Sequence, residues 1–153
     1  MKRLDGRSGV VLDTMVFIYL FEDVAPYAEV CQSLVQRAAA GHYRGVISPV
    51  TAAELLVKPL AAKRHDLADQ YRVALRNMHH LELAIISAET GYMAAALRAK
   101  YGLPLPDMLQ VALAVQAEQP TLITNDRQMR RIREVEVVLL DDLVGGAKAG
   151  PRV

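Results

Sequence analysis

Four acidic side chains stand where the chain passes from one expected element to the next, and carboxylates gathered in this way can bind a metal and move protons. Asp13 ends an apolar run and Asp126 follows another. Asp107 opens an apolar helix, and Glu54 lies one or two turns into a different expected helix. If the fold brings the four together, the chemistry they favour is acid–base and metal chemistry on oxygen-rich substrates.

Ionised carboxylates that share one edge of a sheet repel one another. Two of them about 6 Å apart cost roughly 2–3 kcal/mol at an effective dielectric constant of 20. No lysine stands immediately beside any of the four, so a divalent cation is the simplest way to offset the repulsion. Oxygen ligands without Cys or His indicate Mg²⁺ or Mn²⁺. Because such ions lower the pKa of bound water and clamp phosphoryl oxygens, the residues predict a phosphoryl-transfer or nuclease site.

Each acid also has an ordinary structural explanation. Asp126 or Asn125 can cap the helix that follows, and the helix dipole favours Asp107 in a first turn. The segment Thr51–Glu54 matches a capping box, although Ser48-Pro49 is a competing helix start. It is the combination of four acids that favours a site, because any one of them is explained without it.

The elements that would position these acids alternate along the chain. Strands are expected at residues 9–12, 43–47, 81–86, 121–123 and 136–140. Helices are expected at 15–22, 25–40, 49–57 with an interruption at Pro59, 66–78, 88–101, from Pro104 or Pro106 to about 117, and in a short arginine-rich segment before the last strand. Strands separated by helices predict a parallel sheet with helices on both faces, a three-layer α/β fold. Ligands of such sheets bind outside the carboxyl ends of the strands, where the acids are expected.

Length and composition indicate one soluble domain. The chain has 153 residues, 52% of them hydrophobic and 23% charged, which suits a single core over residues 1–144. Residues 145–153 are expected to form a flexible tail. The single cysteine, Cys31, excludes a disulfide framework and a Cys-rich zinc site. No apolar stretch is long enough for a membrane span, and residues 1–9 have no apolar signal region, so we expect a cytoplasmic protein.

The net charge of +1 at first argues against nucleic acid as a partner, since proteins that coat nucleic acid are strongly basic. The sum, however, combines acids at the strand ends with an arginine run after Asp126. Bound cations would neutralise the acids and leave the remaining protein basic. The run is either a phosphate-backbone contact or a solvated helix face, and its members are Arg127, Arg130, Arg131 and Arg133.

At these residues the chain resembles the PIN-domain ribonucleases, and most closely the VapC-type toxins of bacterial and archaeal toxin–antitoxin pairs. The resemblance spans residues 9 to about 142 and rests on four segments in order: Val10–Thr14, Ser48–Leu55, Leu105–Asp107 leading into Gln110–Ala114, and Leu122–Asp126. It implies a central parallel sheet of about five strands flanked by helices. The implied activity is a metal-dependent endoribonuclease whose products carry a 5′-phosphate and a 3′-hydroxyl.

The resemblance also implies roles for particular residues. Four catalytic carboxylates would gather with one or two Mg²⁺ or Mn²⁺ ions: Asp13, Glu54, Asp107 and Asp126. Asp13 and Asp107 would be the principal metal ligands, with Asp126 a ligand directly or through water. Glu54 would position or deprotonate the attacking water. Three polar residues would support the site: Thr14, Thr124 and Asn125.

The implied partners are an RNA substrate and a cognate antitoxin protein, with no membrane. Residues Met15–Phe21 carry more apolar surface than one helix face normally buries, which predicts a homodimer or antitoxin interface. Complete burial of these residues in the core is the alternative.

Two other functions remain open from the sequence. One is a PIN-like domain that binds RNA or protein without cutting. The other is a phospho-acceptor receiver-like domain, which also places an Asp at a strand end. That domain needs an acidic pair near the first strand and a lysine after a late one. Here Asp13 has no acidic neighbour, and Val138–Leu140 lead to Asp141-Asp142 instead of a lysine. The sequence therefore argues against the receiver-like domain.

Overall fold

A computed structural model describes residues 1–118 and 120–147, and its centre is a parallel sheet of five strands. The strands are β1 (Val10–Leu12), β2 (Gly45–Ile47), β3 (Leu81–Leu83), β4 (Thr121–Thr124) and β5 (Glu136–Leu139). They lie in the order β3-β2-β1-β4-β5, and every neighbouring pair is parallel. The predicted three-layer α/β fold is therefore confirmed.

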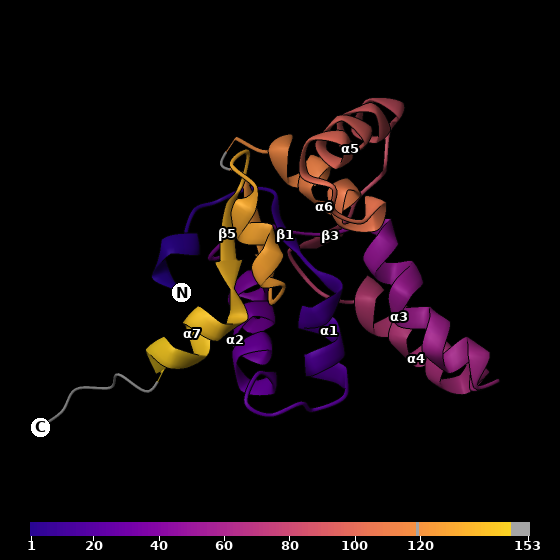
Figure 1. Ribbon diagram of the computed structural model, residues 1–153. Helices are drawn as coiled ribbons and strands as arrows, with labels where there is room; N and C mark the ends of the chain where they lie inside the picture. The colour runs from indigo at the N-terminus through magenta and orange to yellow at the C-terminus, as the bar shows by residue number, and fades with distance from the viewer. Residues whose placement is uncertain (119, 148–153) are drawn as a thin grey trace, which may run out of the picture.

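Helices cover both faces of the sheet (Figure 1). They are α1 (Thr14–Phe21), α2 (Ala28–Ala39), α3 (Pro49–Ala61), α4 (His65–Arg76), α5 (Ala88–Tyr101), α6 (Leu105–Val115) and α7 (Leu140–Ala147), with the 3₁₀ turns η1 (Lys2–Leu4) and η2 (Arg127–Arg131). Helices α5 and α6 lie on one face, whereas α1, α2 and α7 lie on the other, and α3 pairs with α4 beside the sheet.

The alternation of side chains along β1 explains why the core has two halves. Val10 and Leu12 point to one face and pack with side chains of α1, α2 and α7. Val11 points to the opposite face and packs with side chains of α5 and α6. All three side chains are fully buried. Strand β1 is thus the centre of the molecule, and Asp13, which follows it, is attached to a strand that is packed on both faces.

Helix α3 begins where Ser48-Pro49 predicted rather than at the competing capping box. The Ser48 hydroxyl accepts a hydrogen bond from the Val50 N–H at 3.1 Å, and Pro49 occupies the first turn. Glu54 consequently lies in the second turn of α3. The expected interruption at Pro59 was wrong, because the helix continues to Ala61. Pro59 is buried and stands near the end of the helix, where packing against α4 outweighs the one missing backbone hydrogen bond.

The C-terminal part of the chain forms one more helix than the sequence predicted. Strand β5 ends at Leu139, and Leu140, expected at the end of the strand, opens α7. The buried side chains of Leu140 and Leu143 attach α7 to the core. The helix reaches Ala147 and includes the first three residues of the expected tail, while residues 148–153 lie outside the described residues.

The apolar segment at α1 packs largely against the chain's own core. Val16 and Phe17 are buried. The ring of Tyr19 stacks on Tyr27 at 4.6 Å between centroids, and Phe21 lies 4.7 Å from the ring of Tyr71. An interface formed by the partly exposed remainder stays a prediction. Within the described part of the chain, no helix has the length and apolar character needed to cross a membrane.

Candidate active site at the carboxyl ends of the strands

The four predicted acids all follow or face the carboxyl ends of the strands. Asp13 stands between β1 and α1, and its Oδ1 accepts the Thr14 N–H at 2.6 Å, which caps the helix. Asp126 stands between β4 and η2, Glu54 follows β2 in α3, and Asp107 lies in the first turn of α6. The parallel sheet therefore directs all four to one edge.

The raised pKa of Asp107 indicates that the four carboxylates lie near one another. Burial raises its pKa to about 6, and the negative charges of Asp13, Asp126 and Glu54 contribute in that order. Among the described residues, none donates a hydrogen bond to its carboxylate or forms an ion pair with it. The site therefore holds like charges without a cation from the protein to balance them.

Asp13 is the most heavily bonded of the four. Its Oδ1 also accepts the Gln110 side-chain amide at 3.0 Å, and its Oδ2 accepts the Thr124 hydroxyl at 2.5 Å. Burial raises the pKa of Asp13, and the charge of Glu54 raises it further, while the donors from Thr124, Gln110 and Thr14 oppose both effects. These donors fix the orientation of the carboxylate.

A buried chain of side chains connects Asp13 with Glu54. The Thr14 hydroxyl donates to Glu54 and lies 3.2 Å from the hydroxyl of Thr51. Thr51 in turn donates to Gln110 Oε1 at 3.4 Å, and Gln110 donates to Asp13. The predicted supporting residue Thr14 thus contacts a carboxylate of the site, although the exposed Glu54 side chain remains open to solvent.

Gln110 and Thr51 are the site residues that the sequence reasoning did not identify. Gln110 is only 2% exposed and Thr51 is fully buried. The available signal was a single amide inside the apolar run Met108–Ala114, because a buried amide requires hydrogen-bonding partners. What those partners are depends on α3 and β1, which lie far away in sequence.

Replacing Gln110 by Met should destabilise the protein by about 1–3 kcal/mol, since the change leaves buried polar groups of Asp13 and Thr51 short of a partner. Urea unfolding at neutral pH measures the effect. Gln116→Met is the matched control at the C-terminal end of the same helix, because Gln116 is exposed and the one described bond of its side chain is to Thr90 at 2.9 Å. Equal losses in the two variants would remove the structural role assigned to Gln110.

Asp126 and Asn125 have local partners as well. Asp126 Oδ1 accepts the Gln128 N–H at 2.8 Å and caps η2, so the capping explanation for Asp126 is correct as far as this one oxygen is concerned. The Asp126 N–H donates to the Thr124 hydroxyl at 3.1 Å. Asn125 Oδ1 accepts the Asp141 N–H at 3.1 Å, which joins the site loop, Asn125-Asp126 between β4 and η2, to α7.

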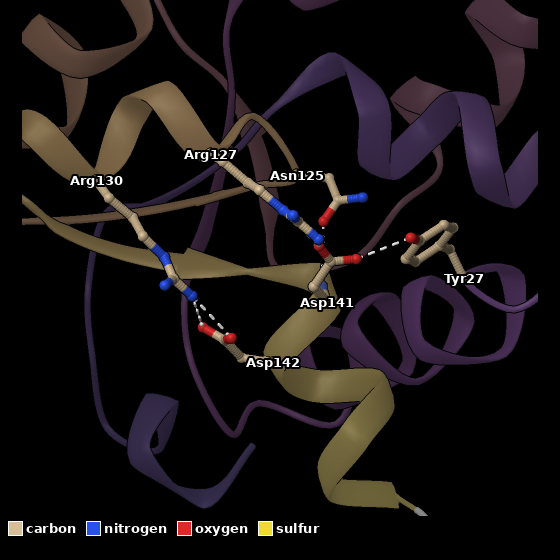
Figure 2. Close-up of polar contacts among 6 residues, drawn as sticks. All are labelled: Tyr27, Asn125, Arg127, Arg130, Asp141 and Asp142. Atoms are coloured by element: carbon tan, nitrogen blue, oxygen red, sulfur yellow. Dashed lines mark hydrogen bonds and ion pairs between the residues drawn. The ribbon is translucent and has the colours of Figure 1, made fainter.

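The arginine run is largely paired within the molecule. Arg127 binds Asp141 and Arg130 binds Asp142 (Figure 2). Arg131 donates to the Tyr101 carbonyl oxygen at 2.7 Å. An RNA contact by these residues stays a prediction, in which a phosphate group would compete with carboxylates that the guanidinium groups already bind.

The donor set fits a hard divalent cation by its chemistry. Carboxylate oxygens are the ligands of Mg²⁺ and Mn²⁺, and the unbalanced negative charge at Asp107 favours a cation there. The side chains do not form a closed cage: in the described ranges, no three His, Cys, Asp or Glu side chains are grouped tightly enough to hold one ion. Metal binding would therefore require the carboxylates to move closer together than they lie in this structure.

Asp107→Asn should stabilise the metal-free protein at neutral pH. Because folding raises the pKa of Asp107 from about 4 to about 6, its favourable contribution is complete below pH 4 and is lost as the pH rises through 6. Asparagine does not ionise, so the variant avoids this loss. Allowing for partial exposure, we expect a gain of about 1–2 kcal/mol at pH 7.5 and almost none at pH 4.

Urea unfolding in EDTA across this pH range measures the effect of Asp107→Asn. The control is Asp69→Asn, since Asp69 is exposed on α4 and pairs only with Arg72 in the described structure. A stability difference for Asp107→Asn that stays flat between pH 4 and 7.5 would contradict the electrostatic description of the site.

Comparison with known proteins adds a family and a set of similar structures. A family model described as PIN domain matches residues 10–135. The structure is similar to a toxin–antitoxin complex from Klebsiella pneumoniae, with a TM-score of 0.65 and 26% identity over 86% of this chain and 97% of that one. No curated protein sequence matches.

Two further similar structures show the same fold at lower identity. One is VapBC2 from Rickettsia felis bound to a DNA fragment from its promoter, with a TM-score of 0.66 and 20% identity over 85% of this chain and 97% of that one. The other is VapBC-1 from nontypeable Haemophilus influenzae, with a TM-score of 0.62 and 20% identity over 86% of this chain and 98% of that one.

Proposed function

The chain belongs to the PIN domain family, and we propose that it is a metal-dependent endoribonuclease that hydrolyses RNA phosphodiester bonds. The observation that carries the proposal is the group of four mutually repelling carboxylates at the carboxyl ends of the strands, without a protein cation beside Asp107 in the described structure. A nuclease site of this kind uses the negative charge to hold Mg²⁺ or Mn²⁺, one or two ions in this protein.

The residues divide the work between holding the metal and handling the water. Asp13 and Asp107 are the principal ligands, and Asp126 is a ligand directly or through water. When bound, the metal supplies a Lewis acid that lowers the pKa of water and stabilises charge on the phosphate. Glu54 positions the attacking water or takes its proton: Thr14 holds Glu54 Oε2, which leaves the second oxygen of this exposed side chain available.

We assign the protein to the toxin half of a toxin–antitoxin pair that acts in the cytoplasm. Support comes from the structure that shares 26% identity and is a toxin–antitoxin complex. The antitoxin is then a separate protein, encoded most simply by an adjacent reading frame. Induced expression of this chain alone should arrest growth, and expression together with the neighbouring small protein should restore it.

Cleavage of a labelled single-stranded RNA by the purified chain tests the chemistry directly. We expect cleavage with Mg²⁺ or Mn²⁺, none in excess EDTA, and recovery when metal is added back, because the carboxylates have no catalytic role without a cation. The products should carry a 5′-phosphate and a 3′-hydroxyl.

EDTA also separates this activity from common contaminating ribonucleases that need no metal. Persistent cleavage in EDTA would contradict the mechanism. Tight RNA binding with no cleavage under any metal condition would instead identify a PIN-like domain that binds without cutting.

A further inference from the structure

The carboxylate of Asp141 receives three side-chain hydrogen bonds, from Tyr27 and Arg127. Asp141 lies in the first turn of α7. Its Oδ1 accepts the Tyr27 hydroxyl at 2.8 Å, and its Oδ2 accepts Arg127 Nε at 3.1 Å and Nη2 at 2.7 Å (Figure 2). These bonds hold the pKa of Asp141 below its usual range, with the bond from Arg127 as the largest cause, so the group stays ionised at neutral pH.

The backbone of Asp141 is bonded to the same loop. Its N–H, which has no acceptor within α7, donates to Asn125 Oδ1 at 3.1 Å. Asn125 immediately precedes Asp126, and Arg127 immediately follows it. Asp141 therefore hydrogen-bonds to both sequence neighbours of the proposed catalytic residue Asp126. It binds Asn125 through its backbone N–H and Arg127 through its side chain.

Asp126, which lies between these two bonded residues, is connected to the centre of the site. The Asp126 N–H donates to the Thr124 hydroxyl, and this hydroxyl donates to Asp13 Oδ2. Asp126 itself caps η2 through its own Oδ1 and has no described bond to α7. Its position accordingly depends on how firmly Asn125 and Arg127 are held.

We propose that Asp141 is a positioning residue of the active site: by binding Asn125 and Arg127, it fixes the backbone that presents Asp126 to Asp13 and Asp107. The inference rests on the proposed nuclease function. It gives Arg127 a different task from the RNA contact predicted from the sequence, because the guanidinium group serves the loop rather than the substrate.

The chain offers a matched control in the neighbouring residue. Asp142 also lies in the first turn of α7 and also pairs with an arginine of η2, with Arg130 Nη2 at 2.8 Å and 2.9 Å from its two oxygens. It has no described bond to Asn125 or Arg127. Asp141→Ala and Asp142→Ala remove the same charge from the same helix turn. Only the first removes the side-chain bonds to Arg127, while the backbone N–H of residue 141 can still donate to Asn125.

Amide hydrogen exchange measures how strongly Asp141 restrains the loop around Asp126, and it needs neither metal nor RNA. Asp141→Ala should raise the exchange rates of the Asp126 and Gln128 amides at least about tenfold, while Asp142→Ala leaves them within twofold. Mn²⁺ affinity by calorimetry should fall about tenfold in Asp141→Ala, as is typical when a residue that orients a ligand is lost. The kcat for RNA should fall with it and KM should change less than twofold. Asp141→Asn should recover part of both, because its carbonyl oxygen still accepts from Arg127.

Arg127→Ala separates the two tasks considered for that arginine. A positioning role predicts weaker Mn²⁺ binding and an unchanged KM, whereas an RNA contact predicts a raised KM and unchanged Mn²⁺ binding. Unchanged amide exchange in both Asp141→Ala and Asp141→Asn would overturn the proposal, whatever the enzyme does. A wild-type chain that neither binds Mn²⁺ nor cuts RNA would refute the proposed function. The exchange rates would still decide whether Asp141 restrains the loop around Asp126.

Discussion

Asp13→Asn should lower the rate of metal-dependent RNA cleavage by at least about 10³-fold, equivalent to about 4 kcal/mol of activation free energy. The carboxylate lies at the centre of the candidate site, and asparagine removes the negative charge that would hold the proposed cation. The variant should still fold, because the asparagine oxygen still accepts the Thr14 N–H that caps α1, and the Thr124 hydroxyl can turn to accept from the new amide. Steady-state cleavage of the labelled RNA measures the loss.

Asp69→Asn is the control for this substitution, since it makes the same change at an exposed position on α4. Its cleavage rate should match that of the wild type. Circular dichroism and thermal unfolding confirm that the Asp13 variant is folded before its rate is compared. A folded Asp13→Asn protein that cleaves RNA at the wild-type rate would contradict the assignment of Asp13 to the active site.

Phe17→Ala should cost about 3–5 kcal/mol of stability, the largest effect we expect from a single core truncation. The Phe17 side chain is fully buried and packs within the half of the core beneath α1 and α2, 6.3 Å between ring centroids from Phe21. Domains of this size have a total stability of about 5–15 kcal/mol, so the melting temperature should fall by about 10 °C.

Thermal unfolding of Phe17→Ala beside Tyr92→Ala tests the assignment of this residue to the core. The Tyr92 side chain on α5 is 69% exposed, so its loss should change the melting temperature by about 2 °C or less. Similar small shifts in both variants would mean that Phe17 faces a partner or solvent and not the interior of its own chain.

The sheet could be predicted from the sequence because its signals are local. Each strand is a short, largely apolar run, and helical segments separate the five runs, as the crossover connections of a parallel sheet require. Helix α5 matches its predicted bounds because Ser87 caps it and Gly102 ends it with φ of 70°, a conformation that glycine adopts without strain.

Helix α7 was missed because its stabilisation is not local. A segment with Gly145-Gly146 has low helix propensity, and the acids that precede it resemble a polar turn. Burial of Leu140 and Leu143 against the core overrides that propensity. The same limit applies to the candidate site: spacing indicated four acids, whereas Gln110 and Asp141 acquire their partners only when distant elements pack.

The position of β1 between β2 and β4 has a consequence for a chain that is still being synthesised. Asp13 obtains its hydroxyl partner from Thr124, 111 positions further along the chain, and such long loops close late in folding. A nascent or truncated chain that stops before β4 contains Thr14 and Gln110 but lacks Thr124, so Asp13 is without one of the three donors that orient it. The proposed nuclease activity would therefore arise only once β4 and Asp126 have been synthesised, and unfinished chains on the ribosome would not cut RNA.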